Sequence, residues 1–406
     1  MISSQEARTT ILSNVSPLPP KELPFTETLG LVLAEDIVSD LDIPPFNNSS
    51  MDGFAVRAED TASAASDSPV SLRISGEIPA GEGKEFSLMP GEALRIMTGA
   101  PMPPGADAVV PKENTETRET TVLINNEAQK GEYVRLIGED ITKGLCVLKK
   151  GTTIRAPEIG LLASLGRSRV KVFRAPTVAV IGTGNELVEV NKPLLKGQIR
   201  DSNSYSLAAQ INGCGAKSFR LGIAKDTRED TLAKISKGFE YDVVITIGGV
   251  SVGEYDFVNQ VLKDLGAELK FWRIRQEPGK PLAFSVLKGK PVFGLPGNPV
   301  SAMVCFEEYV RPALLKMMGK TKLFRPEVSA VLDQDFKKEP GKIYFLRTKL
   351  ERRNGTYFAK PTGPQGSGIL RSMALADGIG IIPEDSSLFK AGDKIRVQMI
   401  DLPEDH

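Results

Sequence analysis

The spacing of hydrophobic residues changes character several times along the chain, and each change marks a different kind of structure. At the start, apolar residues recur at helical spacing from Ala7 to Val15. Ser3 and Glu6 stand three positions apart, which is the pattern of a capping box at a helix start. We therefore predict a first helix, which the prolines from Pro17 onward end.

The next segments contain shorter periodic runs. Residues 28–36 indicate a short helix or a junction between a helix and a strand. Over residues 46–137, short apolar runs alternate with turns rich in glycine and proline, which predicts an all-β module. Residues 138–172 are mixed, with a strand pair followed by a short helix at residues 156–166.

Two further patterns fill the rest of the chain. From Pro176 to about residue 318, buried apolar runs alternate with amphipathic helical stretches, which predicts a doubly wound α/β domain. From about residue 323 to the end, alternating strands return and predict a small β-barrel. The expected α/β strands lie at residues 177–182, 217–223, 242–248, 268–274, 282–286 and 291–295, with helices at residues 202–213, 228–239, 256–266 and 300–318.

Charge and hydropathy exclude some function classes. Lys plus Arg and Asp plus Glu both number 51, so the formal net charge is zero. A protein that binds nucleic acid through phosphate contacts needs a basic field, so we expect no nucleic-acid partner. No window is apolar enough for a membrane span, and the first residues lack the pattern of a secretory signal. We therefore expect a cytoplasmic protein without a membrane partner.

The residues available for catalysis are also limited. His406 is the only histidine and it is the last residue, which argues against histidine-based zinc sites and proton shuttles. The three cysteines lie far apart and form no metal or disulfide pattern. The chemistry is therefore expected from carboxylates, lysines, arginines, hydroxyls and backbone N–H groups, with a hard metal ion as a further candidate.

Four glycine-rich loops follow the carboxyl ends of the expected α/β strands. They are Thr183–Leu187, Gly248–Asp256, Pro278–Pro281 and Pro296–Ser301. Ligands of open α/β sheets bind beyond these strand ends, and glycines let backbone N–H groups approach an anion closely. The four loops together predict a phosphate or oxyanion pocket.

Carboxylates adjoin these loops. Asp201 and Asp226 are typical of residues that cap a helix or a turn. Glu186 and Asp256 stand beside glycine-rich loops, where a Mg²⁺ ion that bridges phosphates needs oxygen ligands. We therefore predict Glu186 and Asp256 as metal ligands.

Two named motifs match this sequence only in part. The segment 182–187 lacks the third glycine of a dinucleotide-binding fingerprint. Gly249–Gly253 matches a nucleophile elbow around Ser251, and His406 would complete the order of a triad. A triad histidine sits on a structured loop, whereas His406 ends a polar tail, so a serine hydrolase remains the less favoured alternative.

Taken together, the motifs resemble one family. Residues 49–57, 95–101, 106–113, 134–141, 182–187, 197–205, 248–257, 278–281 and 294–302 resemble, in order, the motifs of molybdopterin molybdenumtransferase, the MoeA and gephyrin E-domain family. Residues 363–383 resemble its last segment. Each motif is weak alone, but their order over nearly the whole chain is specific.

The resemblance implies a multidomain protein of the α/β plus β class. Its centre is a doubly wound α/β, MogA-like molybdopterin-binding domain, accompanied by a β module and a C-terminal β-barrel. The implied boundaries are 1–45 and 138–174 for an elongated linker and dimerisation domain, 46–137 for the β module, 175–320 for the α/β domain and 323–406 for the barrel.

The resemblance also implies the reaction and its partners. The substrates are molybdate and adenylylated molybdopterin; the pyrophosphate is hydrolysed, molybdate is inserted and AMP leaves, with Mg²⁺ as the cofactor. A molybdopterin adenylyltransferase would donate the substrate. The protein would be a homodimer in which the β module of one subunit faces the α/β domain of the other. A non-catalytic, peptide-binding scaffold of the gephyrin E-domain type is the alternative.

Matching positions imply the site residues. Asp52, Thr98, Asp140, Glu186 and Asp256 would be catalytic. Those expected to bind substrate are Arg135, Asp201, Ser202, Asn203, Gly248, Gly249, Ser251, Lys280, Pro296, Gly297, Asn298, Pro299, Ser301, Arg347 and Ser367.

One position departs from the family pattern. Many relatives carry a lysine where this chain has Glu277, three residues before Lys280. A carboxylate there puts oxyanion binding at that spot in doubt, unless Arg273 or Arg275 substitutes.

Overall fold

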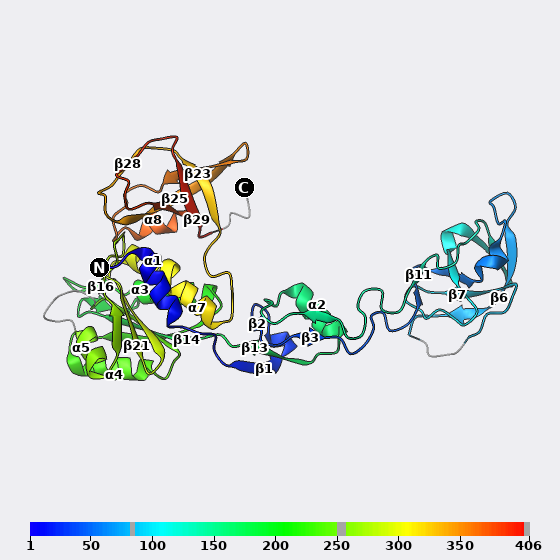
Figure 1. Cartoon of the computed structure of the whole chain (residues 1–406), viewed down its shortest axis with the longest axis horizontal. Coiled ribbons are helices and arrows are strands. Elements are labelled where there is room, and N and C mark those ends of the chain that lie inside the picture. The colour runs from blue at the N-terminus through cyan, green and yellow to red at the C-terminus, as the bar shows by residue number, and fades with distance from the viewer. Residues whose placement is uncertain (82–85, 250–256, 402–406) are drawn as a thin grey trace. The chain divides into compact units, whose positions relative to one another are not determined.

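The computed structural model describes residues 1–81, 86–249 and 257–401 (Figure 1). The chain forms two compact units, which are described separately below. The larger unit comprises Met1–Ala34, Gly151–Ile159 and Arg169–His406, and the smaller unit comprises Glu35–Lys150 and Gly160–Ser168.

The first helix of the larger unit is the one that the sequence predicts. Helix α1 spans Ser4–Ser13 and begins with a capping box in which Ser3 and Glu6 bond each other's backbone N–H groups. Ala7 and Ile11 on its apolar face are almost fully buried in the core of the α/β sheet. The prediction is confirmed.

A six-stranded sheet forms the centre of the larger unit (Figure 1). Its strand order is β17-β14-β18-β22-β21-β19, with parallel pairs up to β22 and antiparallel pairs beyond it. The strands are β14 (Thr177–Thr183), β17 (Lys217–Ala224), β18 (Val243–Ile247), β19 (Glu268–Phe271), β21 (Ala283–Leu287) and β22 (Lys290–Leu295).

Both faces of this sheet are covered. On one face Val178 and Val180 pack with Leu207 of α3 (Asn203–Gly213). On the other, Ile181 and Val244 pack with α4 (Arg228–Gly238) and α5 (Phe257–Asp264). Continuous burial explains the apolar runs in the sequence, and the doubly wound fold class is confirmed.

The expected helix at residues 300–318 has an interruption. It consists of α6 (Pro299–Cys305), a π-helical segment η4 (Phe306–Val310) and α7 (Arg311–Met317). Pro312 has no N–H to donate and its ring would crowd the carbonyl four residues before it, so a regular α-helix cannot pass through this point.

The C-terminal strands close into a barrel. The barrel contains β23 (Glu327–Leu332), β25 (Ile343–Arg353), β26 (Thr356–Pro361), β27 (Gly378–Ile382) and β29 (Lys394–Met399). Strand β25 pairs with both β26 and β27, which closes the circle, and β20 (Gln276–Glu277) adds to its edge. Helix α8 (Leu370–Ala374) and the strand pair β24 (Phe336–Lys337) and β28 (Leu388–Phe389) complete this part, and the predicted barrel is confirmed.

A small sheet lies elsewhere in the larger unit. It joins β1 (Pro20–Pro24), β13 (Arg169–Phe173) and β2 (Val32–Leu33). Of the two alternatives for residues 28–36, the short helix is wrong and the junction between a helix and a strand fits. The 3₁₀ segment η1 (Phe25–Glu27) ends just before these residues, and Gly30 then takes a φ of +80°. A positive φ does not fit a right-handed helix, so the chain turns and enters β2.

The smaller unit is largely β, as predicted for residues 46–137. Its main sheet has the order β8-β5-β7-β6-β10-β9, and two strand pairs accompany it. The strands are β3 (Ile37–Val38), β4 (Asn48–Ser49), β5 (Gly53–Val56), β6 (Val70–Ile78), β7 (Glu92–Ile96), β8 (Ala108–Pro111), β9 (Thr115–Arg118), β10 (Thr121–Ile124), β11 (Val134–Arg135) and β12 (Cys146–Leu148), with 3₁₀ turns η2 (Ala58–Thr61) and η3 (Lys112–Asn114).

Two further points concern the whole chain. Helix α2 spans Ala156–Ser164, where the sequence predicts a short helix. Within the described residues, none of the helices combines the length and the apolar character that crossing a membrane requires. The division into four domains stays a prediction.

Candidate functional site

A pocket of about 440 Å³ lies where three of the glycine-rich loops meet in the larger unit. These loops follow β14, β18 and β22, which are neighbouring parallel strands whose carboxyl ends share one rim. The lining residues are Thr183, Gly184, Glu186, Leu187, Ile199, Arg200, Asp201, Ser202, Asn203, Asp226, Ile247, Gly248, Gly249, Gly297, Pro299 and Gly368.

The pocket wall depends on glycine. Gly248 has a φ of +86°, and a Cβ there would lie 2.9 Å from the carbonyl oxygen of Thr183. A Cβ on Gly297 would lie 3.8 Å from the Cα of Gly248, so these two loops run against each other. Because no side chains intervene, backbone groups form this part of the wall.

Asn203 joins two sides of the pocket. It is the first residue of α3, and its side-chain Nδ2 donates a 2.6 Å hydrogen bond to the carbonyl oxygen of Gly297. Its Oδ1 is buried and has no hydrogen-bond partner among the described residues. A ligand that donates a hydrogen bond would satisfy this oxygen.

Glu186 provides a free carboxylate at the same rim. It is exposed and lines the pocket, and its side chain makes no hydrogen bond or ion pair within the residues that the structure describes, while its backbone carbonyl accepts a 2.9 Å bond from the N–H of Ile199. Its carboxylate lies over Gly184, where an added Cβ would come within 2.5 Å of Glu186 Oε2. The short strands β15 (Leu187–Val188) and β16 (Ile199–Arg200) pair just beyond it.

The other two acidic residues of the lining are already engaged. Asp201 is 2% exposed and accepts hydrogen bonds from the backbone N–H and the hydroxyl of Ser204, in the first turn of α3. Asp226 accepts a 3.0 Å hydrogen bond from the backbone N–H of Asn185. Both carboxylates therefore shape the loops that carry the pocket.

The barrel contributes to the edge of the pocket. Asn298 donates a 2.9 Å hydrogen bond to the hydroxyl of Ser367, and the N–H of Val300 bonds the Ser367 carbonyl at 3.1 Å. Gly368, the next residue, lines the pocket. The structure therefore brings Asn298 and Ser367 together beside the pocket, although neither lines it.

Arg347 lies nearby in the barrel and is fully buried. Its Nε donates to the Ser372 hydroxyl and its Nη2 to the Gly366 carbonyl, both over 3.3 Å. Nη1 has no partner among the described residues. Burial lowers the pKa of the guanidinium, and Tyr344 opposes this effect.

Three other predicted residues do not line the pocket, and neither does Glu277, where the chain departs from the family pattern. Lys280 is exposed on the turn between β19 and β21, Ser301 is buried in α6, and Pro296 is buried before Gly297. Glu277 lies on a different pocket of about 460 Å³, where its carboxylate is 3.5 Å from Lys342 Nζ.

The two arginines that the sequence offers as substitutes for a lysine at position 277 have other contacts. The guanidinium of Arg273 stacks over the ring of Trp272, 4.2 Å from its centroid. Arg275 forms an ion pair with Glu384 at 3.4 Å. Lys342 is therefore the cation that lies beside Glu277.

In the smaller unit, Asp52 and Thr98 are direct partners. The backbone N–H and the hydroxyl of Thr98 each donate a 2.8 Å hydrogen bond to Asp52 Oδ1. These bonds hold the pKa of the Asp52 carboxyl below its usual range. The next residue, Gly53, has no room for a side chain, since a Cβ there would lie 2.0 Å from the Val110 carbonyl oxygen.

The remaining predicted residues of the smaller unit are exposed. Arg135 is the last residue of β11, which pairs with β4. Asp140 lies in the loop that follows, and its backbone N–H donates a hydrogen bond to the Ile43 carbonyl. Asp256, Ser251 and His406 lie outside the described residues. Among the residues that are described, no group of three His, Cys, Asp or Glu side chains forms a metal cluster.

The chain was compared with known families and proteins. Residues 2–166 match the model of the MoeA N-terminal region (domain I and II), residues 179–316 the probable molybdopterin binding domain, and residues 329–400 the MoeA C-terminal region (domain IV). Molybdopterin molybdenumtransferase 2 of Mycobacterium tuberculosis is 39% identical over 98% of this chain and 99% of its own. This chain belongs to the molybdopterin molybdenumtransferase family.

Other relatives agree with this assignment. A molybdopterin molybdenumtransferase of a Nostoc species is 39% identical over 91% of this chain and 86% of its own. The crystal structure of a molybdopterin biosynthesis MoeA protein from Pyrococcus horikosii matches with a TM-score of 0.84 and 38% identity, covering 98% of this chain and 99% of that one. The family resemblance in the sequence is thus confirmed.

Several lining residues are absent from the sequence-based set. Arg200 stands directly before the predicted Asp201, so its position next to that motif could have indicated a cation in the pocket. Ile199 is an apolar residue on a short strand, and Gly368 comes from the distant barrel. Their position could be recognised only once the long-range contacts were known.

Proposed function

We propose that this protein inserts molybdate into adenylylated molybdopterin, with hydrolysis of the pyrophosphate and release of AMP. Membership of the molybdopterin molybdenumtransferase family supports a transferase of molybdenum cofactor biosynthesis. The reaction in detail is our proposal.

The observation that carries the proposal is the pocket at the strand ends. Backbone groups of Gly248, Gly249 and Gly297 form its wall, and the carboxylate of Glu186 at its rim has no partner among the residues that the structure describes. Backbone N–H groups suit phosphate oxygens, and the rim of parallel strands is the usual ligand site of such sheets. A nucleotide joined through a pyrophosphate fits this combination.

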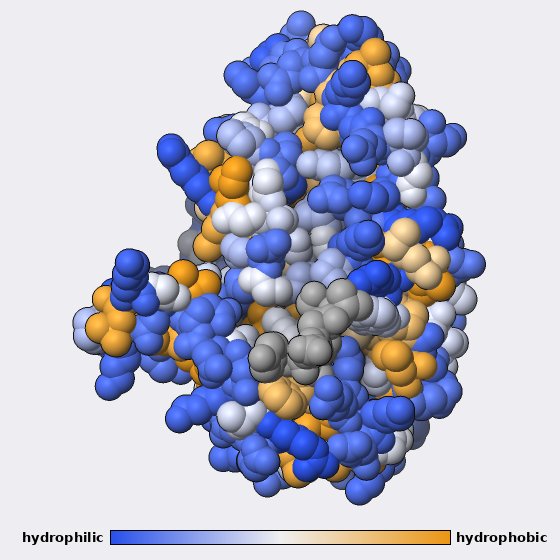
Figure 2. All heavy atoms as spheres, turned by 90° about the vertical axis from the view of Figure 1, so that its left-hand side faces the viewer, coloured by the Kyte–Doolittle hydropathy of each residue, from blue (hydrophilic) through white to orange (hydrophobic). Residues whose placement is uncertain are grey.

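The polar surface of the larger unit agrees with a charged ligand. Figure 2 shows a face on which hydrophilic and near-neutral residues predominate and hydrophobic residues form small separate patches. A ligand that carries phosphates is better matched by such a face than an extended apolar partner would be.

We also propose Mg²⁺ as the cofactor. In proteins Mg²⁺ is usually held by one or two carboxylates together with water and substrate phosphates. The free carboxylate of Glu186 fits this role, and Asp256 is the second proposed ligand. When bound, the ion would offset the charge that develops on the leaving phosphate.

The chain's own groups would orient the substrate. Asn203 would hold the ligand between α3 and the Gly297 loop, since its Oδ1 has no partner in the described part of the chain. As the family resemblance implies, we propose that the oxyanion is bound by Lys280, Ser301 and Arg347. We also propose that Arg135 binds substrate and that Asp52, Thr98 and Asp140 take part in catalysis.

The assembly and location are proposals as well. We propose a homodimer, a molybdopterin adenylyltransferase as the donor of substrate, and the cytoplasm as the compartment. Light scattering tests the dimer by measuring a molar mass of twice the 43.9 kDa of one chain. A mass of one chain at micromolar concentration would contradict it.

The test of the reaction is AMP release from adenylylated molybdopterin. We expect release that needs both Mg²⁺ and molybdate, measured by chromatography of the nucleotide. A scaffold protein would release no AMP under these conditions. A serine hydrolase would be labelled at Ser251 by a fluorophosphonate probe, which the proposal does not expect.

A further inference from the structure

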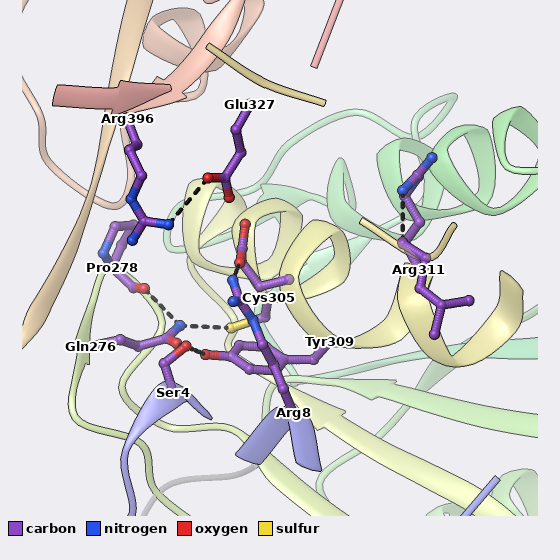
Figure 3. A network of polar contacts seen from close by, with 11 residues as sticks. Ser4, Arg8, Gln276, Pro278, Cys305, Tyr309, Arg311, Glu327 and Arg396 are labelled. Atoms are coloured by element: carbon purple, nitrogen blue, oxygen red, sulfur yellow. Dashed lines mark hydrogen bonds and ion pairs between the residues drawn. The ribbon is translucent and has the colours of Figure 1, made fainter. Parts of the chain in front are cut away.

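A buried polar network links the first helix to the turn that carries Lys280 (Figure 3). Arg8 of α1 forms an ion pair with Glu308 of η4, whose side chain is 1% exposed. Beside it, the hydroxyls of Ser4 and Tyr309 are 2.8 Å apart. The π-helical segment thus turns two successive side chains, Glu308 and Tyr309, onto α1.

Tyr309 connects this network to Gln276 by a hydrogen bond. Its hydroxyl donates to the side-chain Oε1 of Gln276, so the Ser4 hydroxyl is the donor in the contact with Tyr309. Tyr309 is 1% exposed and Gln276 is fully buried. With Oε1 held as an acceptor, the amide group of Gln276 has one orientation, and its Nε2 faces the next turn.

The amide of Gln276 holds that turn by its backbone. Nε2 donates to the carbonyl of Pro278 over 3.0 Å and to the carbonyl of Gly279 over 3.3 Å. Nε2 also lies 3.5 Å from the sulfur of Cys305. Figure 3 shows Tyr309, Gln276 and Pro278 joined in this sequence.

The backbone of the turn at Gly279 and Lys280 is closely packed and hydrogen-bonded. Gly279 has a φ of +97°, and a Cβ there would lie 2.6 Å from both Cys305 Sγ and Gln276 Nε2. The carbonyl of the next residue, Lys280, accepts a 3.0 Å hydrogen bond from the N–H of Ile274. The backbone of Lys280 is therefore fixed from both sides, while its side chain is exposed.

We propose that Gln276, oriented by Tyr309, is a positioning residue that holds the backbone of Lys280 in place for binding of the molybdate oxyanion. This inference rests on the proposed function, in which Lys280 binds the oxyanion. Gln276 is buried and does not touch the ligand; it acts through the carbonyls of Pro278 and Gly279. A flexible lysine binds an anion less well when its backbone is not fixed, because more conformations must be given up.

The test is calorimetric titration of molybdate into the full-length protein and three variants. Gln276→Met keeps the length of the side chain but removes the amide, and Lys280→Ala removes the cation. We expect each to weaken molybdate binding about tenfold, and the double variant to weaken it no further than one of them, because both act on the same contact. Tyr309→Phe should show a smaller loss in the same direction.

A matched control separates positioning from folding. Glu308→Gln breaks the ion pair with Arg8 on the same helical segment and leaves the hydroxyl of Tyr309 and the amide of Gln276 in place. It should lower the melting temperature without changing the dissociation constant for molybdate. In steady-state kinetics, Gln276→Met should raise the KM for molybdate and leave the KM for adenylylated molybdopterin unchanged.

The results that would overturn the inference are distinct from failure of the proposed function. Unchanged molybdate binding in Gln276→Met, or losses that multiply to about a hundredfold in the double variant, would show that Gln276 does not act through Lys280. Absence of AMP release from the unmodified protein would overturn the proposed reaction instead. In that case the titrations would still report on the link between the two residues.

Discussion

The side-chain amide of Asn203 donates a 2.6 Å hydrogen bond to the carbonyl oxygen of Gly297. This bond ties the start of α3 to the loop before α6, two segments that face each other across the pocket. The remaining side-chain oxygen of Asn203 is buried without a partner among the described residues, so it is available to a bound ligand.

Replacement of Asn203 by aspartate should weaken nucleotide binding. Asn203→Asp removes the donor and places a carboxylate against the Gly297 carbonyl, so we expect AMP affinity to fall about tenfold or more. Isothermal titration with AMP measures the change. Asn212→Asp is the control, since it makes the same change near the other end of α3 and keeps the Oδ1 that accepts from Ser218. Equal affinities in the two variants would contradict the assigned role.

Neutralisation of Glu186 should affect turnover and not stability. Glu186→Gln keeps the size of an exposed side chain that has no partner in the described part of the chain, so the melting temperature should be unchanged. Loss of a preorganised charge lowers turnover by roughly 10²–10³-fold. AMP release measures the effect, with Glu189→Gln as the control, which removes the charge that pairs with Arg220 and accepts a hydrogen bond from the Tyr205 hydroxyl. Near-normal turnover in Glu186→Gln would remove this residue from the mechanism.

Glu277 should have little influence on the nucleotide. Its carboxylate is half-exposed and pairs with Lys342 on a separate pocket. Such pairs contribute about 0–1 kcal/mol, and a lysine at this position would also repel Lys342, so Glu277→Lys should lower the unfolding free energy by about 1 kcal/mol and leave AMP affinity as it is. Chemical denaturation and titration with AMP check the two statements. A clear gain in AMP affinity would place Glu277 closer to the nucleotide than the structure does.

The ion pair between Arg174 and Asp242 should make stability depend on pH. Burial raises the pKa of Asp242, but the Arg174 guanidinium at 2.6 Å and two bonds from Thr177 outweigh it, and the pKa falls from 3.8 to about 2. A lowered pKa in the folded state stabilises the protein above the unfolded pKa, and this contribution is lost as the pH falls towards 2.

Asp242→Asn is the variant that tests this dependence. At pH 7 we expect it to lower the unfolding free energy by about 2 kcal/mol, and at pH 3 by about half as much. Urea denaturation at the two pH values gives the comparison. A destabilisation that does not change between pH 7 and pH 3 would show that the charge of Asp242 is not its cause.

Local patterns in the sequence predict much of the fold. The capping box of Ser3 and Glu6, the six strands of the central sheet and the five strands of the barrel all depend on neighbouring residues, and they are present where the patterns indicate. The π-helical segment at Phe306–Val310 was missed, because helical periodicity continues through it and only Pro312 signals a break.

The site can be predicted only in part from the sequence, because some of its contacts join distant residues. Loops that follow parallel strands can be expected to share a rim, and Gly248, Gly297 and Glu186 do so. The contacts Asn298–Ser367 and Tyr309–Gln276 join residues far apart in the chain. Such pairs depend on tertiary packing, which no local pattern reports.

The central claim is that the pocket at the strand ends holds the nucleotide of the substrate, and a crystal structure of the protein soaked with AMP, Mg²⁺ and molybdate tests it most directly. The account predicts AMP in the pocket of about 440 Å³, with its phosphate against Gly248, Gly249 and Gly297 and an oxygen of Glu186 facing the metal. AMP bound at another place on the protein, with this pocket empty at saturating nucleotide, would contradict it.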